Sequence, residues 1–166
     1  MPADRPPLLL YQSLRELYLY YEATFLCGRS SNSFVSPCDH VITFFDHHFF
    51  HLVKLGHPAS IKPLRMDREK PAILAADKNF AEYTHDRQRA IYLASALLCI
   101  REPDEVWLNG ELKSAKWAYL KRFTAKPYSL TVFLIGERLE GLVPITSFPC
   151  RARDARKWAR GTKIFS

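Results

Sequence analysis

The chain has 166 residues, of which 48% are hydrophobic, and this is enough apolar material for one compact domain with a continuous core. Lysine and arginine number 24 against 17 aspartates and glutamates, so the formal net charge of +7 predicts a polyanionic partner, with nucleic acid favoured over an acidic protein. The absence of long apolar stretches and the four scattered cysteines argue against a membrane protein or a disulfide-stabilised secreted one, so we expect a cytoplasmic protein with no membrane partner.

The first predicted element is an amphipathic helix from Leu8 to Cys27, because apolar residues recur at steps of three and four and Gly28 follows at the position of a helix C′ residue. Its tyrosines fit a helix half buried at a rim, with hydroxyl groups reaching water. Residues 28–37 are rich in Ser, Asn and Gly and predict a loop, whereas residues 40–45 predict a short strand. The segment that follows this strand fits either a helical turn or a second strand.

Prolines predict a long surface loop over residues 56–71, and a second helix is predicted from Thr84, its N-cap, to Ile100. The remaining predicted elements are strands, at residues 105–108, 116–123, 130–135 and 142–147. The last two should form an antiparallel hairpin with a slightly long loop. This order predicts a single α+β domain with helices packed on an antiparallel sheet.

The densest cluster of titratable groups follows the first predicted strand, where His47, His48 and His51 precede Lys54. Imidazole can both accept and donate a proton near neutral pH. Metal-independent RNA cleavage needs a base for the 2′-hydroxyl, an acid for the leaving 5′-oxygen and cations for the phosphorane, and this segment has groups of each kind. On a helix His47, His51 and Lys54 share a face, whereas on a strand His47, His51 and Val53 do.

Two other interpretations of these histidines stay open. They could be solvated side chains at the end of a strand, or hydrogen-bonded groups of the core. A zinc site could also be built from Cys38, His40 and His51, with His47 and His48 as further ligands. Because the spacing matches no zinc pattern and adjacent histidines seldom both bind one ion, we predict no metal and no cofactor.

A second candidate region is the basic tail over residues 150–163. Such a run can bind phosphate through its charge and through the bidentate fork of arginine, and the candidate substrate-binding residues are Arg156, Lys157 and Arg160. Trp158 could stack on a base or pack the tail onto the core. The alternative is a solvated terminal helix.

Hydroxyl groups form a third candidate. Thr146 and Ser147 at the end of the last predicted strand could hold phosphate oxygens, although such residues are also ordinary at strand ends. Tyr119, in the predicted strand 116–123, could stack on a base or pack within the sheet.

Several short motifs occur in a fixed order along the chain: Glu102-Pro103-Asp104-Glu105-Val106-Trp107, Tyr119-Leu120-Lys121, Thr146-Ser147-Phe148, and Arg156 through Arg160-Gly161-Thr162-Lys163-Ile164-Phe165. In combination they resemble the phage-associated barnase, EndoU, colicin and RelE-like nuclease domains. The resemblance covers residues 40–166 and leaves residues 1–39 as an N-terminal helix and loop extension.

The resemblance implies an RNA-cleaving fold with a curved antiparallel sheet and no metal requirement, found in phage proteins and in toxins. It implies that His51 is the catalytic histidine of the family, with His48 as the second candidate, and that Lys54 is the basic residue that follows it. The other implied catalytic residues are the strand tyrosine Tyr119 and the hydroxyl pair Thr146 and Ser147. The additional histidines and Pro144 inside the last strand depart from the family pattern, which leaves open which imidazole is catalytic.

We therefore predict a metal-independent endoribonuclease, a toxin that leaves a 2′,3′-cyclic phosphate and a 5′-hydroxyl on RNA, with transfer RNA, messenger RNA and ribosome-bound RNA all open as targets. Such a toxin needs an acidic antitoxin or immunity protein, which could dock on the tyrosine-rich first helix or on the basic cleft. The alternative is a non-catalytic nucleic-acid-binding or phage interaction module that uses the basic tail.

Overall fold

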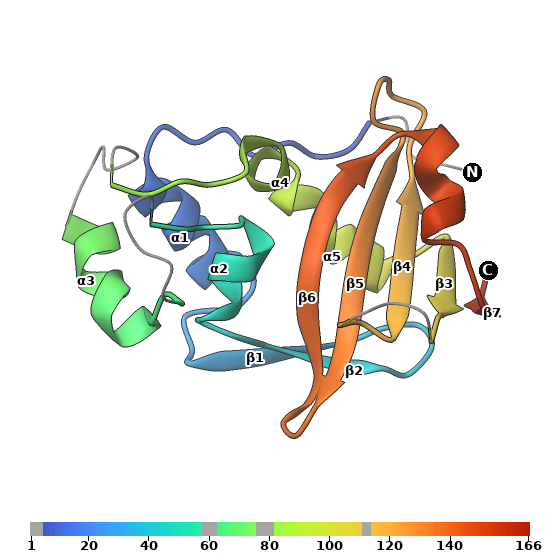
Figure 1. Cartoon of the computed structure of the whole chain (residues 1–166), viewed down its shortest axis with the longest axis horizontal. Helices are drawn as coiled ribbons and strands as arrows, with labels where there is room; N and C mark the ends of the chain where they lie inside the picture. Colours follow the sequence, from blue (N-terminus) through green and yellow to red (C-terminus); the bar gives the residue numbers. More distant parts are fainter. Residues whose placement is uncertain (1–4, 58–62, 76–81, 111–113) are drawn as a thin grey trace.

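The computed structural model describes residues 5–57, 63–75, 82–110 and 114–166 (Figure 1). Its helices and strands are, in chain order, α1 (Leu14–Thr24), β1 (Ser31–Val35), β2 (Val41–Phe45), α2 (His48–Leu52), α3 (Met66–Ala75), α4 (Arg87–Ile91), α5 (Leu93–Arg101), β3 (Glu105–Leu108), β4 (Trp117–Arg122), β5 (Leu130–Arg138), β6 (Gly141–Cys150), the 3-10 helix η1 (Ala152–Lys157) and β7 (Thr162–Phe165). Within the described part of the chain, no helix has the length and apolar character needed to cross a bilayer.

The strands form one open sheet in the order β1-β2-β6-β5-β4-β3-β7. Figure 1 shows α5 behind this sheet, while α1, α2 and α3 lie beside its β6 side. The predicted α+β fold is confirmed, but the sheet is mixed rather than purely antiparallel, because β2 and β6 pair in parallel, with Ile42 opposite Leu142. Since this pairing involves only the start of β6, the later part of that edge is covered by α2 and α4 instead.

The predicted strands at 40–45, 105–108 and 116–123 are confirmed as β2, β3 and β4. The predicted hairpin is also present, and its strands continue to Arg138 and restart at Gly141, so its loop is shorter than predicted. The loop predicted over residues 28–37 was wrong in part, because it contains β1. This strand lies at the sheet edge, where polar residues are tolerated on both faces.

The helix predicted from Thr84 to Ile100 is interrupted at Tyr92, which divides it into α4 and α5. Thr84 is not its N-cap, because the backbone of Thr84 is paired with Gly56 in an isolated bridge. The cap is Asp86, whose carboxylate accepts a hydrogen bond of 3.1 Å from the backbone N–H of Arg89.

The loop predicted over residues 56–71 was wrong for its last part, which forms the first half of α3 and includes Pro71. Burial of Met66 and Ile73 stabilises this helix, and Lys70 forms an ion pair of 3.3 Å with Glu22 of α1. Residues 58–62 of the predicted loop lie outside the described residues.

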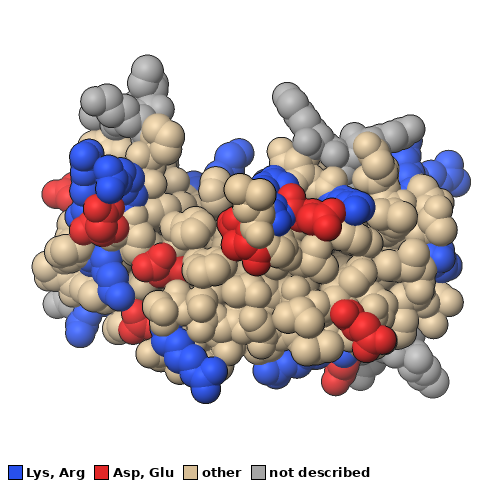
Figure 2. All heavy atoms as spheres, turned by 90° about the horizontal axis from the view of Figure 1, so that it is seen from below, with Lys and Arg blue, Asp and Glu red and all other residues tan. Residues whose placement is uncertain are grey.

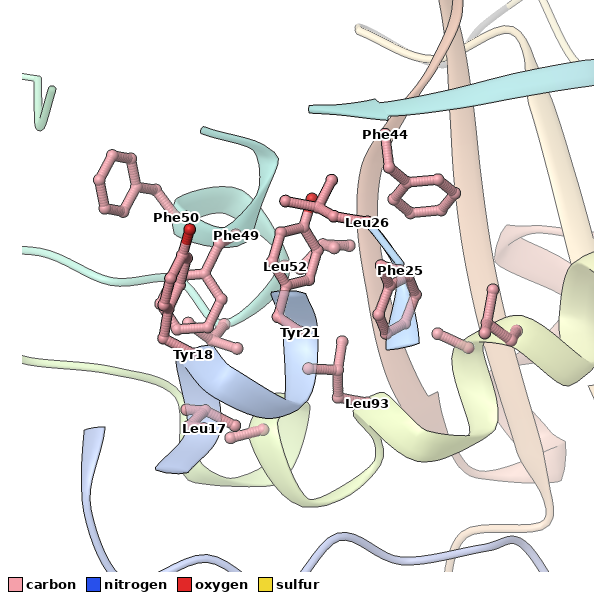
Figure 3. Packing of buried hydrophobic residues seen from close by; sticks show 14 of the residues in the cluster. Leu17, Tyr18, Tyr21, Phe25, Leu26, Phe44, Phe49, Phe50, Leu52 and Leu93 are labelled. Atoms are coloured by element: carbon pink, nitrogen blue, oxygen red, sulfur yellow. The ribbon is translucent and has the colours of Figure 1, made fainter. Parts of the chain in front are cut away.

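The first helix is shorter than predicted and begins after Ser13, whose hydroxyl accepts from the backbone N–H of Glu16 at 3.1 Å. Tyr18 and Tyr21 are fully buried rather than at a rim (Figure 3). The Tyr21 hydroxyl donates to the carbonyl of Phe45 at the end of β2. These two tyrosines belong to the core and cannot serve as a docking face for an antitoxin.

The segments before and after the predicted boundary, between positions 39 and 40, pair and pack with each other. The boundary falls in the turn between β1 and β2, which pair along their whole lengths. The aromatic residues of α1 and β2 also share one buried cluster, in which the rings of Phe25 and Phe44 lie 5.1 Å apart. The N-terminal helix is therefore part of the support for whatever site α2 carries.

Candidate functional site

A pocket of about 410 Å³ lies where α2, α4 and the edge of β6 meet. Its wall includes His51, Lys54, His57, Arg89 and Thr146. We call this cavity the basic pocket. None of the described residues that line it is an aspartate or glutamate. Its charge is therefore complementary to an anion such as a phosphodiester.

The short helix α2 positions His51. Five residues are too few for a helix that is stable alone, so α2 depends on its packing. The ring of Phe49 lies 5.1 Å from that of Tyr18 and 5.5 Å from that of Tyr21, which fixes the buried side of α2 against α1 (Figure 3). His51 comes two residues later, on the other side of the helix, and is exposed.

Lys54 stands in the turn that ends α2. The backbone N–H of Leu55 donates to the carbonyl of Phe50 at 2.8 Å, a pattern in which glycine is the usual residue before the donor. Here that position is Lys54, with a φ angle of 53°. A side chain is strained in this left-handed conformation, and such strain is concentrated at functional sites.

Arg89 reaches the pocket from α4 with its guanidinium held on three sides. Its Nη1 donates to Oγ1 of Thr146, its Nε lies 3.5 Å from Oδ2 of Asp86, and its Cζ lies 5.5 Å from the centre of the Phe148 ring. The arginine side chain is still 23% exposed. The geometry therefore orients a planar cation that stays accessible from the pocket.

Thr146 and Ser147 point to opposite faces of the sheet. Thr146 lies opposite Leu134 and lines the basic pocket, whereas Ser147 lies opposite Phe133 on the covered face and is only 3% exposed. Because Oγ1 of Thr146 accepts from Arg89, its own hydroxyl proton can be donated to a bound phosphate oxygen. The structure thus places only Thr146 of this pair at the pocket.

The segment after α2 brings a second imidazole to the pocket. Gly56 and Thr84 exchange two backbone hydrogen bonds, each of 2.8 Å. This bridge holds the adjacent His57, whose ring meets that of Tyr83 edge-on at 5.8 Å. The Tyr83 hydroxyl in turn donates to a carboxylate oxygen of Glu69 in α3.

A second pocket, of about 330 Å³, shares His51 and Ile145 with the basic pocket and is also lined by His47, His48 and Arg138. The two cavities meet at His51. Of the three clustered histidines His47, His48 and His51, His51 is therefore the one that lines both cavities.

The environments of His51 and His48 differ. Burial lowers the pKa of His51, and the neighbouring His47 lowers it further, so the His51 imidazole is neutral at pH 7. Deeper burial, with added repulsion from His47 and His51, lowers the pKa of His48 to about 3. Nδ1 of His48 accepts a hydrogen bond of 2.9 Å from the backbone N–H of Phe45, which places this histidine in the support of α2.

His48 should make the folded state sensitive to acid. Its pKa is lower in the folded chain than the ordinary histidine value of 6.5, so the unfolded chain binds more protons below pH 6.5 and stability falls as the pH is lowered from there. The change His48→Asn keeps an acceptor for Phe45 and removes the titration, and we expect a shallower fall in melting temperature between pH 6.5 and 4. An equal fall in the melting temperatures of the two proteins between pH 6.5 and 4 would contradict this assignment.

Tyr119 lies in a separate polar cluster under the β1–β2 turn. Its hydroxyl is 2.6 Å from Nδ1 of His40, 2.8 Å from Oγ of Ser36 and 3.2 Å from Sγ of Cys38. Tyr119 is fully buried and does not line the basic pocket.

The zinc alternative needs Cys38, His40 and His51 in one place. The first two lie with Tyr119, whereas His51 faces the pocket beside β6. Across the described ranges, no three His, Cys, Asp or Glu side chains are grouped so that they could hold a metal ion.

The basic tail folds as η1 and β7 instead of one terminal helix. Arg156, Lys157 and Arg160 are exposed, and Nε of Arg160 donates to the carbonyl of Arg156 at 2.9 Å. None of the three lines the basic pocket. On the face seen in Figure 2, basic and acidic side chains are interspersed across a largely uncharged surface, so the net positive charge is not concentrated there.

Sequence reasoning missed Arg89 and His57. Arg89 stands three residues after Asp86, which is a recognisable capping pattern, but its partner Thr146 is 57 residues away. His57 lies in the segment that its prolines predict to be a surface loop, so it was not identified as a site residue from the sequence. Its signal was the short distance in the chain from Lys54.

In the comparison with protein families, the model described as phage-Barnase-EndoU-ColicinE5/D-RelE like nuclease2 matches residues 53–166. The match includes Lys54, His57, Arg89 and Thr146 and begins two residues after His51. Comparison with curated proteins gives no match, and comparison with solved structures gives none either.

Proposed function

Because the chain belongs to the phage Barnase-EndoU-ColicinE5/D-RelE-like nuclease 2 family, we propose that it is an endoribonuclease that cuts RNA by metal-independent transesterification. The products are a 2′,3′-cyclic phosphate and a 5′-hydroxyl. The observation that carries the proposal is the basic pocket, where two imidazoles, an ammonium, a guanidinium and a hydroxyl line one cavity.

In this proposal His51 is the general base. A base must be neutral to accept the proton of the 2′-hydroxyl, and the lowered pKa of His51 keeps it neutral at pH 7. His57, which lines the same pocket, is the proton donor to the leaving 5′-oxygen. His48 supports α2, and Tyr119 and Ser147 support the sheet.

The remaining pocket residues handle the phosphate. Attack of the 2′-oxygen on phosphorus forms a pentavalent phosphorane with added negative charge, and bond breakage to the 5′-oxygen then gives the cyclic phosphate. Lys54 and Arg89 stabilise that charge, and the Thr146 hydroxyl donates to a non-bridging oxygen. A guanidinium that is already oriented loses little conformational freedom when it binds the transition state.

Replacing Lys54 by glycine separates function from folding. Glycine adopts a positive φ without strain, so Lys54→Gly is expected to leave the free energy of unfolding unchanged or to raise it by up to about 1 kcal/mol. The loss of the ammonium is expected to lower the cleavage rate about 10²-fold. Urea unfolding and initial rates measure the two effects. A marked loss of stability would show instead that Lys54 serves the fold.

The pH dependence of kcat/KM should report His51. Because the pKa of His51 lies below its ordinary value of 6.5, activity should persist below pH 6.5 and fall only as the pH drops through the lowered pKa. His47→Ala removes a positive neighbour, so it should move this acid limb to higher pH. An acid limb above pH 6.5 in the unmodified protein, or one that does not respond to His47→Ala, would assign the base elsewhere.

We further propose that this nuclease is a toxin that acts in the cytoplasm on RNA, with transfer RNA among its candidate substrates. An acidic antitoxin or immunity protein complements the charge of the basic pocket and blocks it. Arg156, Lys157 and Arg160 on the tail attract the RNA backbone from outside the pocket.

The test is incubation of the protein in chelator with an RNA strand and with the DNA strand of the same sequence. Cleavage of RNA alone is expected, because DNA has no 2′-hydroxyl to attack the phosphate. Cleavage of both strands, or binding of RNA without cleavage, would contradict the proposal. The second result would favour the non-catalytic binding module.

A further inference from the structure

A third pocket, of about 280 Å³, lies between η1 and the sheet face that α5 does not cover. Aromatic residues Tyr128, Phe148 and Trp158 line it together with the basic residues Arg151 and Arg153. In Figure 1, η1 lies over the sheet toward β3 and β7, while α2 lies beyond the opposite side of β6. The family assignment and the proposed chemistry leave this pocket unexplained.

Phe148 connects the third pocket to the basic pocket. It lies two residues after Thr146 on the same strand, so both side chains point to the same face of the sheet. On one side, the guanidinium carbon of Arg89 lies 5.5 Å from the centre of the Phe148 ring. On the other side, the ring of Trp158 meets it edge-on with the centroids 4.9 Å apart.

The charge of the third pocket suits an anion. Arg151 and Arg153 are exposed at the start of η1, and Asp154, which also lines the pocket, is 3.7 Å from Lys157 and offsets that lysine. Trp158 is half-buried and lines the pocket beside this charge. Aromatic rings next to arginines are the pattern by which proteins bind single-stranded nucleic acid, with bases stacked and phosphates neutralised.

We propose that the third pocket is a second nucleotide subsite, which holds a base of the single-stranded substrate against Trp158 or Tyr128 and its phosphate at Arg151 and Arg153. This inference rests on the proposed function of the basic pocket. Phe148 separates the two pockets, with its ring centre 5.5 Å from Cζ of Arg89 and 4.9 Å from the ring centre of Trp158, so the subsite takes a nucleotide beyond the one whose phosphate lies at Arg89. A substrate must therefore be longer than a dinucleotide to occupy both pockets.

The test is the affinity of the full chain for labelled 2′-O-methyl oligoribonucleotides, which cannot be cut by 2′-hydroxyl attack, measured by fluorescence anisotropy. We expect the octamer to bind at least about tenfold more tightly than the dinucleotide. In the double variant Arg151→Gln/Arg153→Gln most of this advantage should be lost. The negative slope of log affinity against log salt should become less steep by about 1.4, because two phosphate contacts are removed. Both arginines are exposed, so folding should be preserved.

The matched control is Arg29→Gln/Arg68→Gln, which removes the same charge from exposed positions on other elements. It should retain the preference for the octamer. An equal loss in both double variants would reduce the effect to net charge and overturn the subsite, as would similar affinity of the unmodified protein for both lengths. If the length preference is present but ordinary RNA is not cut, the subsite stands and the proposed chemistry fails.

Discussion

The change His51→Ala is expected to lower the rate of RNA cleavage by about 10²–10⁴-fold with little effect on the melting temperature. The large effect follows from the position of His51, which is the imidazole shared by the two cavities beside β6. The small effect on stability follows from its exposure on α2, whose buried contacts are made by Phe49. Single-turnover rates on a short RNA substrate measure the loss.

The control for this change is His85→Ala, which removes an imidazole that contacts Tyr11 at 2.7 Å and lines neither cavity. Its cleavage rate should stay within a few-fold of that of the unmodified protein. If His51→Ala and His85→Ala have the same small effect, His51 is not the base and the proposed mechanism is wrong.

Arg89→Lys is expected to lower the cleavage rate by about 10²–10³-fold although the positive charge is retained. The guanidinium donates to Thr146 while its Nε faces Asp86, and it lies over the ring of Phe148. An ammonium has no planar fork and cannot make these contacts together. The loss should therefore appear in kcat rather than in KM, because it removes an orientation needed in the transition state.

Arg87 provides the comparison for this variant, because it lies on the same helix and is exposed outside the basic pocket. Arg87→Lys should leave kcat unchanged. Full activity of Arg89→Lys would show that charge alone suffices at this position, and it would remove the argument from the geometry of Arg89.

Part of the site could be predicted from the sequence. His51 and Lys54 are close together in the chain, so their proximity did not depend on the fold, and Thr146 stood at the end of a hairpin whose strands were clear from their apolar runs. The conformation around His51 could not be predicted, because the short segment fits a helix and a strand equally well. Packing of Phe49 between Tyr18 and Tyr21, which are about 30 residues earlier, selects the helix.

The rest of the site depends on contacts between distant segments. Arg89 reaches Thr146 only because the predicted long helix breaks at Tyr92 and its first part, α4, packs beside β6. The edge of β6 is available to α4 only because β2 pairs with the start of that strand. Neither the break nor the parallel pairing has a local signal that turn or periodicity rules could detect.

The most direct test of the account is the identity of the ends produced from a DNA oligonucleotide that contains one ribonucleotide, digested in chelator and analysed by mass spectrometry. The account predicts a single cut after the ribonucleotide, with a 2′,3′-cyclic phosphate on one product and a 5′-hydroxyl on the other, and no cut in the His51→Ala protein. Products that end in a 3′-hydroxyl and a 5′-phosphate would contradict it, because they require water rather than the 2′-oxygen to attack the phosphorus.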